Sequence, residues 1–548
     1  MIGVLVDSGD RETAREFFEL FKTPWEFYRQ DRHYEVLLCV GEGKFDRTAK
    51  LGILYASSKT EWDDDHQTEC CQQRPTRTLL YQGNRIPIYG NSVTFPEKGA
   101  GLLEDEESHE PMAHIARFGE RWLARIGYDL LSEIRTLLTV GQPSVNASIP
   151  TLELHIALLR GLVIGSGVRL VEIPPVPDGY RFIACLTHDI DHPSIRRHKW
   201  DHTTLGFLYR AGFGSLWGFI RGRITIRNLL KNWMAALKLP FVQFGLAEDF
   251  WQGFDDRYLK LENGLRSTFF VIPFENRPGE SCRGRASSLR GARYAARDIA
   301  NTIHNLLNAG CEIGLHGIDA WRDSTIGREE LEEIRRVAKA SEVGVRMHWL
   351  FHDQDSPLIL EKAGASYDST MGYNATVGYR TGTTQVYKPF QASRLLELPL
   401  HVMDTALFYP AYLGLSAKEA EVVLDRMVKN GAQFGGCLTV NWHDRSLAPE
   451  RLWDACYRDL IESLRDRGAW FATAGEAVAW FRKRRSAVFE TDSTELGAVR
   501  VGVPADSADR LPGLRMRLRE AGQRGEMTDR TIKESVNAVG ACGPTMLT

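Results

Sequence analysis

Short apolar runs alternate with amphipathic helical stretches through the middle of the chain. The runs typical of strands are residues 182–187, 267–272, 311–315, 343–349, 365–367, 395–400, 437–441 and 470–472. Helical periodicity lies between them, at 295–308, 328–340, 417–430 and 449–467. Strands that alternate with helices indicate βαβ units and a parallel sheet. Seven or eight such units predict an α/β fold built on a distorted (β/α)7–8 barrel.

The residues before the barrel predict a separate N-terminal α/β domain, spanning 1–175. It has a strand-like run at 34–40, a hairpin pattern over 79–95, and helical periodicity at 113–138 and 151–162. The acidic run 104–107 is expected to be a solvated loop. Pro174, Pro175, Pro177 and Gly179 then mark a domain boundary. The barrel is expected over 176–485. Residues 486–548 predict a polar extension, with short β segments within 499–518 and flexible residues from 520 onward.

One segment, residues 200–249, interrupts the alternation between the first and second predicted strands. It is rich in aromatic and basic residues, among them Trp217, Phe219, Arg221 and Trp233. The favoured interpretation is a helical insertion that packs its aromatic side chains against the barrel. A lid over the barrel mouth, or peripheral contact of 213–240 with a membrane surface, is the alternative.

Composition narrows the class of protein. With 548 residues and a formal net charge of -3, the chain does not suit a nucleic-acid binder that depends on phosphate contacts. No apolar run is long enough to cross a bilayer. Charged residues within the first 15 positions do not suit a secretory signal, so a cytoplasmic location is expected. Nine scattered cysteines without a C-x-x-C pair indicate reduced thiols. The oligomeric state is left open.

Polar side chains recur where the predicted strands end. In chain order they are His188, Asp189 and Asp191; His316; Arg346 and His348; Arg380; Asp404; and His443. In a parallel barrel the carboxyl ends of all strands face one mouth, so these side chains can converge. One aspartate with two histidines suits zinc or a similar divalent ion. A second carboxylate can act as base, and an Asp–His pair can supply a proton, which together predict metal-assisted amide or ester hydrolysis.

Residues 180–485 resemble the polysaccharide deacetylase superfamily, carbohydrate esterase family 4 and its relatives. The resemblance rests on an ordered set of motifs: T-H-D-I-D, S-T-F-F-V-I-P, E-I-G-L-H-G, Y-D-S-T-M-G-Y, Y-R-T-G, E-L-P-L and L-T-V-N-W-H. It implies a metal-dependent enzyme that removes N-acetyl, or less readily O-acetyl, groups from a glycan or glycan precursor. A cyclic-amide or ureide hydrolase of the same fold and a catalytically silent glycan-binding protein are the alternatives.

The resemblance assigns roles by position. Asp189 resembles the catalytic base and Asp191 the metal-binding aspartate, although Ile190 separates them and the two roles could be exchanged. His316 matches the first metal-binding histidine. The position of the second is occupied by Ala320, which is the feature that favours a silent protein.

His348 is the preferred replacement for the second histidine, with Asp319 and His192 as rivals. The implied cofactor is a divalent metal ion, zinc above others. Among the remaining positions, Arg380 matches the arginine that steers the base, His443 the imidazole that protonates the leaving amine, and Asp404 the carboxylate that orients it. Three further residues are expected either at the substrate groove or in the core: Tyr367, Asp368 and Trp442.

Overall fold

The structure is a computed structural model that describes residues 1–42, 49–71, 73–96, 102–282, 284–491, 499–502, 511–521 and 527–532. The chain divides into two compact units. Unit 1 comprises Met1–Gly179, Tyr379–Phe390 and Trp480–Thr548, and unit 2 comprises Tyr180–Gly378 and Gln391–Ala479.

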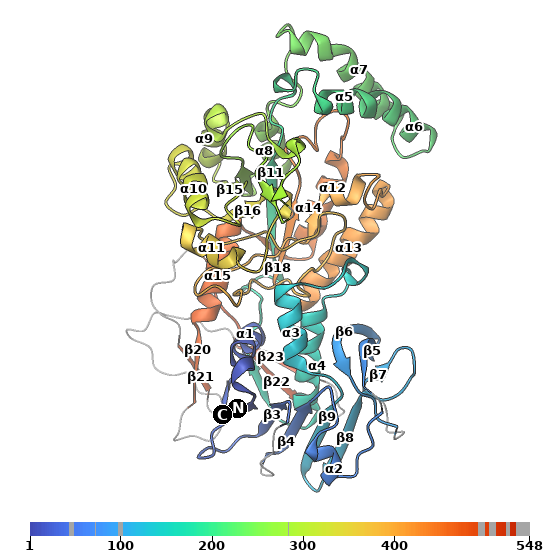
Figure 1. Cartoon of the computed structure of the whole chain (residues 1–548), viewed down its shortest axis with the longest axis vertical. Helices are drawn as coiled ribbons and strands as arrows, with labels where there is room; N and C mark the ends of the chain where they lie inside the picture. Colours follow the sequence, from blue (N-terminus) through green and yellow to red (C-terminus); the bar gives the residue numbers. More distant parts are fainter. Residues whose placement is uncertain are drawn as a thin grey trace. The chain divides into compact units, whose positions relative to one another are not determined.

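Unit 2 is built on a parallel sheet (Figure 1). Its strand order is β16-β15-β12-β11-β18-β17, and β19 also pairs with β11. Every one of these pairs is parallel. All nine residues of β11 are buried, as expected of a strand covered on both faces. The strands are β11 (Phe182–Ile190), β12 (Thr268–Val271), β15 (Glu312–Gly317), β16 (Val345–Met347), β17 (Val402–Met403), β18 (Cys437–Asn441) and β19 (Ala469–Phe471).

Two further segments close the curl of this sheet. Residues 365–367 and 395–400, predicted as strands, form single parallel bridges instead, Val345↔Asp368 and Asp368↔Glu397. The N–H of His401 then donates to the carbonyl of Thr439 on β18. Backbone hydrogen bonds therefore run from β16 through these two segments to β18. The predicted barrel-like α/β fold is confirmed, as a curled parallel sheet.

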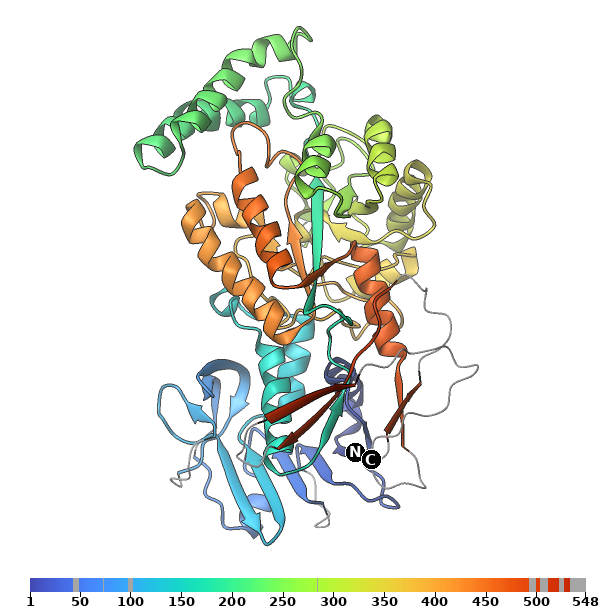
Figure 2. The same ribbon diagram turned by 180° about the vertical axis from the view of Figure 1, so that it is seen from behind.

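Helices cover the outside of the curled sheet (Figures 1 and 2). The helix α14 shows why they do so, because Tyr457, Leu460, Ile461 and Leu464 form one buried stripe at helical spacing. A small hairpin joins β13 (Glu280–Ser281) to β14 (Gly284–Arg285). The helices are α8 (Phe254–Glu262), α9 (Ala300–Asn308), α10 (Ser324–Ala338), α11 (Ser356–Ala363), α12 (Asp404–Phe408), α13 (Ala417–Phe434) and α14 (Asp454–Asp466). The last helix of the chain, α15 (Ala474–Ser486), begins in unit 2, and its residues from Trp480 onward belong to unit 1.

The segment between β11 and β12 is helical, as predicted. It contains α5 (His202–Tyr209), a π-helical turn η4 (Arg210–Gly214), α6 (Ser215–Ile220) and α7 (Ile226–Gln243). Its buried side packs Phe207 and Leu239 against Trp251. Phe207 therefore packs as predicted. For the other aromatic residues of the segment the prediction is wrong, because most of them are exposed. These are Trp200, Tyr209, Phe213, Trp217, Phe219, Trp233, Phe241 and Phe244.

Unit 1 has a six-stranded sheet in the order β2-β1-β3-β4-β9-β8, parallel except for the hairpin β8–β9. Its strands are β1 (Ile2–Leu5), β2 (Trp25–Phe27), β3 (Val36–Val40), β4 (Leu51–Tyr55), β8 (Ala113–Phe118) and β9 (Arg121–Ile126). A second, antiparallel sheet contains β5 (Arg74–Tyr81), β6 (Asn84–Ser92) and β7 (Glu104–Asp105). The helices are α1 (Arg11–Phe21), α2 (Glu61–Asp65), α3 (Leu130–Thr139) and α4 (Thr151–Gly165).

Two predictions for unit 1 are wrong. Residues 113–126 form the β8–β9 hairpin instead of a helix, since Gly119 turns the chain at φ 65° and β9 pairs with β4. The acidic run begins with a strand, β7, whose Asp105 makes a buried ion pair with Arg77 at 2.7 Å.

The C-terminal residues add strands to unit 1. The strands β22 (Met516–Ala521) and β23 (Met527–Ile532) form an antiparallel sheet with β10 (Leu170–Glu172). Another pair, β20 (Val488–Thr491) and β21 (Val499–Gly502), is also antiparallel. The predicted flexible tail from 520 onward is strand at 520–521 and 527–532, and its other residues lie outside those that the structure describes.

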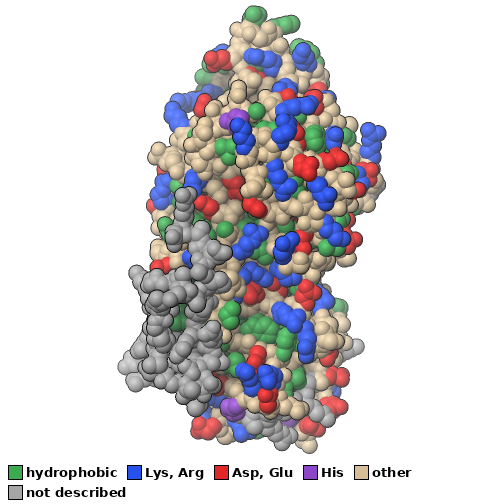
Figure 3. All heavy atoms as spheres, turned by 90° about the vertical axis from the view of Figure 1, so that its left-hand side faces the viewer, with side chains coloured by type: hydrophobic (Ala, Val, Ile, Leu, Met, Phe, Trp, Pro, Cys, Tyr) green, Lys and Arg blue, Asp and Glu red, His purple; other side chains and the backbone are tan. Residues whose placement is uncertain are grey.

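The surface carries both signs of charge. On the face that Figure 3 draws, acidic and basic side chains are interspersed. Within the described residues, no helix is both long and apolar enough to cross a membrane.

Candidate active site

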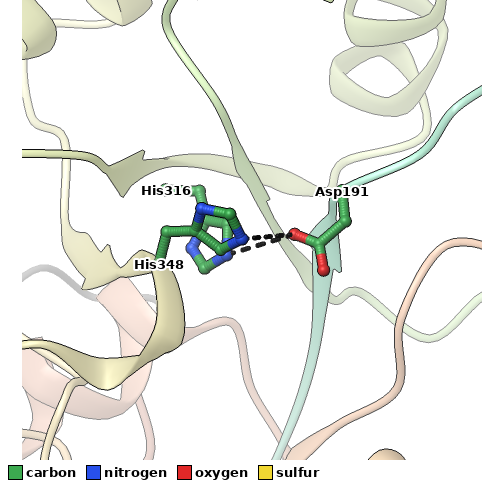
Figure 4. Close-up of side chains that lie close together, drawn as sticks. All are labelled: Asp191, His316 and His348. Carbon is green, nitrogen blue, oxygen red and sulfur yellow. Dashed lines mark ion pairs between the residues drawn. The ribbon is translucent and has the colours of Figure 1, made fainter. Parts of the chain in front are cut away.

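Three side chains from different strands converge at the carboxyl end of the unit 2 sheet (Figure 4). Asp191 follows β11 directly, His316 lies on β15, and His348 follows β16. The Nε2 atoms of His316 and His348 lie 3.4 and 3.6 Å from Asp191 Oδ1. Ligand atoms around a tetrahedral zinc ion lie about 3.3 Å apart, since each is about 2.0–2.2 Å from the metal. The spacing therefore suits one divalent ion.

The protonation of this cluster also suits a cation. His316 has its Nδ1 at 3.0 Å from the carbonyl of Arg346, so Nδ1–H donates there and Nε2 keeps its lone pair for a metal. Burial lowers the pKa of His348 well below its usual value, which keeps the imidazole neutral. Burial raises the pKa of Asp191, but the imidazoles that surround it, on His316, His348 and His443, outweigh burial and hold that pKa well below its usual range, so the carboxylate is ionised.

One atom of the cluster lacks a hydrogen-bond partner. Among the described residues, Asp191 Oδ1 is buried and accepts no hydrogen bond. A buried carboxylate oxygen left in this state is costly unless a cation completes its coordination. With two imidazole nitrogens beside it, the donor set fits the expected divalent metal.

The backbone that follows β16 aims His348 at the cluster. Trp349 and Leu350 adopt left-handed conformations, with φ of 65° and 54°. Arg290 secures this turn, because its Nη2 donates to the carbonyl of His348 at 2.8 Å and to that of Ile318 at 2.8 Å. Strained backbone of this kind persists where surrounding contacts enforce it, and it is common at functional sites.

Asp189 lies beside the cluster and is held at both oxygens. Its Oδ1 accepts from Arg346 Nη1 at 3.0 Å, and its Oδ2 accepts from Asn441 Nδ2 at 2.8 Å. Its Oδ2 is also 3.8 Å from His316 Nε2. Two hydrogen bonds fix Arg346 in turn. Its Nη1 donates to the Thr187 hydroxyl at 2.7 Å, and its Nε donates to the Ser369 carbonyl at 3.1 Å. The carboxylate is thus immobilised next to the proposed metal position.

His443 and Asp404 form a second functional pair. Asp404 begins α12 and His443 follows β18, and Nδ1 of His443 lies 2.6 Å from Asp404 Oδ1. Asp404 Oδ2 also accepts from the backbone N–H of His443 at 2.8 Å and from the hydroxyl of Ser446. Burial lowers the pKa of His443, but the negative charge and hydrogen bond of Asp404 outweigh it and raise that pKa to about 9. The free Nε2 points toward the cluster, 3.8 Å from Asp191 Oδ2.

One cavity of about 460 Å³ in unit 2 is lined by Asp189, Asp191, His316, His348 and His443. Such a volume is typical of sites for small molecules or single sugar units. Its walls carry aromatic and cationic side chains besides the polar groups already described: Trp349, Phe351, Tyr409, Tyr412, Arg210, Arg290, Arg445 and Arg451. Two of the aromatics, Trp349 and Tyr412, are 40% and 43% exposed, so their rings are accessible to a ligand.

Of the two places expected for Tyr367, Asp368 and Trp442, the substrate groove or the core, the structure has all three in the core. Trp442 is fully buried and stacks on Tyr457 at 5.1 Å between ring centroids. The hydroxyl of Tyr367 donates to Glu312 at 2.8 Å. Asp368 is buried and accepts from the Thr370 hydroxyl at 2.5 Å. Their predicted contact with substrate is corrected to a structural role, because none of them lines the cavity in the described part of unit 2.

Arg380 is not part of the curled sheet of unit 2. It belongs to unit 1, where its carbonyl accepts from Gln142 N–H at 2.7 Å and its side chain lies against Gly141. Within unit 2 the arginine that pairs with Asp189 is Arg346, at 3.0 Å, a pairing that the sequence had not assigned. The sequence placed both Arg346 and Arg380 near predicted strand ends, and the fold shows which of the two belongs to the curled sheet of unit 2.

The rival metal ligands have other partners. Asp319 accepts from the N–H of Glu280 at 2.8 Å and pairs with Arg322 at 3.2 Å. His192 has its Nδ1 3.1 Å from His198 Nε2. Ala320, at the position of the missing histidine, is fully buried. His188 is structural, because its Nε2 lies 2.9 Å from the buried Glu262. Asn441 and Arg290 were not predicted, although Asn441 stands within the L-T-V-N-W-H motif.

No protein-family model and no curated protein matches this sequence. Solved structures similar to it include a candidate polysaccharide deacetylase from Mycobacterium smegmatis, with 19% identity, a TM-score of 0.36, and coverage of 59% of this chain and 100% of that one. A family 4 carbohydrate esterase from Streptomyces lividans in complex with acetate has 10% identity, a TM-score of 0.24, and coverage of 54% and 93%. A peptidoglycan deacetylase from Bacillus subtilis has 14% identity, a TM-score of 0.21, and coverage of 57% and 95%.

Proposed function

We propose that this chain is a metal-dependent N-deacetylase that acts on a glycan or glycan precursor. The observation that carries the proposal is the convergence of Asp191, His316 and His348 beside a fixed carboxylate, Asp189, and a cationic imidazole, His443, at one cavity. This is the equipment for metal-assisted hydrolysis of an amide or ester. The order of the sequence motifs, which resembles the polysaccharide deacetylases, supports the choice of an acetyl group.

Asp191, His316 and His348 would hold the metal ion, and one carboxylate with two imidazoles suits zinc. When bound, such an ion lowers the pKa of a coordinated water toward 7 and polarises a carbonyl group. The remaining chemistry belongs to the protein. Asp189 accepts a proton at the oxygen that faces the cluster, and its contacts with Arg346 and Asn441 hold it in place.

His443 serves as the general acid. Its Nδ1–H donates to Asp404, so the transferable proton sits on Nε2, the atom that faces the cluster. The raised pKa keeps this imidazole protonated at neutral pH. An amine leaves far more readily when it is protonated, which favours N-acetyl over O-acetyl substrates.

A glycan substrate is favoured over a cyclic amide by the walls of the cavity. Trp349 and Tyr412 present accessible rings, and flat aromatic faces suit the apolar face of a sugar ring. The cavity also has room for more than a small cyclic amide.

Acetate release tests this proposal. The purified protein is incubated with a panel of N-acetylated oligosaccharides, their O-acetylated counterparts and a cyclic amide, before and after chelation and after zinc is restored. We expect acetate from at least one N-acetylated glycan, loss of release on chelation and recovery with zinc. Asp191→Asn should abolish release, whereas Asp319→Asn, which alters the rival carboxylate, should retain it. Release that survives complete metal removal, or ring opening of the cyclic amide alone, would contradict the proposal, and binding without release would indicate a silent protein.

A further inference from the structure

The helical segment between β11 and β12 exposes an unusually apolar surface. We call the exposed side of α5, η4, α6 and α7 the hairpin face; Figures 1 and 2 show α6 and α7 side by side at the edge of unit 2. Its side chains include Phe213, Leu237 and Phe244, which are 77%, 75% and 79% exposed. Large apolar side chains clustered in this way mark an interaction surface. The other members are Leu205, Tyr209, Leu216, Trp217, Phe219, Ile220, Ile226, Leu230, Trp233, Met234, Phe241 and Leu246.

The helix α7 shows how regular this surface is. Its exposed apolar residues recur at the spacing that keeps them on one side of a helix, and at 100° per residue they span an arc of about 100°. They are Ile226, Leu230, Trp233, Met234, Leu237, Phe241 and Phe244. The opposite side is buried through Leu229, Asn232, Ala235, Leu239 and Val242. The helix thus has two apolar sides. One side packs against unit 2, and none of the described residues covers the other.

The charged side chains within this segment have one sign, and the nearest carboxylates in the sequence, Asp201 and Glu248, flank it. Residues 202–247 contain six basic residues and no aspartate or glutamate. On α7, Arg227, Lys231 and Lys238 are exposed and follow the apolar arc along one border, about 100–140° from Ile226. On the neighbouring α6 turn, Arg221 and Arg223 are exposed as well. An apolar stripe bordered by lysine and arginine is the pattern of a helix that lies in a membrane interface.

We propose that the hairpin face binds the surface of an anionic lipid bilayer, with α7 lying parallel to the membrane plane. The basic border complements the negative headgroups, and the apolar arc inserts at the boundary between headgroups and acyl chains. A second copy of this chain fits less well, because a self-contact would bring the basic borders of the two copies together. A neutral soluble glycan fits less well, because it has no negative charge to complement the basic border. The proposal does not depend on the reaction that unit 2 catalyses.

Vesicle co-sedimentation of the full-length protein tests this surface. The protein is mixed with vesicles of phosphatidylcholine alone and with vesicles that also contain phosphatidylserine, over a range of salt concentrations. We expect binding to the anionic vesicles, weaker binding at high salt, and little binding to phosphatidylcholine. The double variant Lys231→Glu and Lys238→Glu should lose at least about fivefold in partition coefficient per lysine. The double variant Leu237→Ser and Phe244→Ser should lose at least about tenfold.

Matched controls come from elsewhere in unit 2. Arg297→Glu with Lys418→Glu makes the same change in net charge, and Val422→Ser removes an exposed apolar side chain. These variants should bind vesicles like the wild type, and all variants should keep the wild-type melting temperature. No binding to anionic vesicles, or equal binding by hairpin-face and control variants, would overturn the proposal. So would a dimer that only Leu237→Ser with Phe244→Ser dissociates, because a second copy would then be the occupant.

Discussion

The contact between Asp404 and His443 can be tested by a change of one atom, Asp404→Asn. The substitution keeps the size of the side chain but removes the negative charge that faces Nδ1 of His443 at 2.6 Å. In the wild type this charge raises the pKa of His443 from 6.5 to about 9 against the effect of burial. The difference corresponds to about 3 kcal/mol in favour of the protonated imidazole. In the variant, only the charges of Asp191 and Asp189 oppose burial, so the pKa should fall back toward 6.5.

The consequence for activity follows from the protonated fraction. At pH 8, about nine tenths of His443 is protonated when its pKa is 9, and about 3% when its pKa is 6.5. A general acid must be protonated to act, so kcat at pH 8 should fall about 30-fold or more. The alkaline limb of the kcat profile should move from about pH 9 toward pH 6.5, and part of the lost activity should return as the pH is lowered.

The assay is acetate release from the best N-acetylated substrate between pH 5 and 10, with bound zinc and melting temperature measured in parallel. Asp425→Asn is the control, because Asp425 lies on the outer helix α13 and pairs with Lys429 at 2.6 Å. An alkaline limb that stays near pH 9 in Asp404→Asn would refute the assignment of His443 as an acid whose pKa is set by Asp404. A loss of bound zinc would show instead that Asp404 supports the metal centre.

Three other substitutions probe different parts of unit 2. Asp189→Asn should retain bound zinc in a chelator competition but lower kcat at least about 100-fold, because the proton acceptor is lost; full activity would contradict its role as base. Trp349→Ala should raise KM for a glycan with little change in kcat, since the ring is expected to contact substrate away from the reacting group; an unchanged KM would refute that contact. Leu464→Ala should lower the free energy of unfolding by about 2–5 kcal/mol in denaturant titration, because the side chain is fully buried, whereas the exposed Val422→Ala should change it little.

The barrel-like sheet and the convergence of one aspartate with two histidines were the most predictable features of the sequence. Asp191, His316 and His348 each stand at the end of an apolar strand-like run, and the carboxyl ends of parallel strands necessarily meet at one edge of a sheet. In the structure their ligand atoms lie within 4.8 Å of one another. Ala320 stands where a histidine was expected, but the cluster was still predictable. The next strand, β16, is followed by His348, whose imidazole could be proposed as the replacement.

The arginine beside the base could not be chosen from the sequence. Arg346 and Arg380 both stand near predicted strand ends, and a long guanidinium can reach a carboxylate from several strands. The choice depends on which segments belong to the curled sheet, and Tyr379–Phe390 joins unit 1 instead. Core residues such as Trp442 raise the same problem, because an aromatic next to a catalytic histidine can face either the cavity or the interior.

The hairpin β8–β9 shows a second limit. Residues 113–126 carry helical periodicity, yet β9 adds to the sheet beside β4, from Leu51↔Trp122 to Tyr55↔Ile126. Pairing with a strand some seventy positions earlier overrides the local preference, and no local pattern reports such pairing.

The most direct test of the account is an anomalous scattering measurement at the zinc edge on crystals of the zinc-loaded protein. The account predicts one peak at coordination distance, about 2.0–2.2 Å, from Asp191 Oδ1 and the Nε2 atoms of His316 and His348. A peak held by other side chains, or no peak at these three atoms in zinc-saturated crystals, would contradict it.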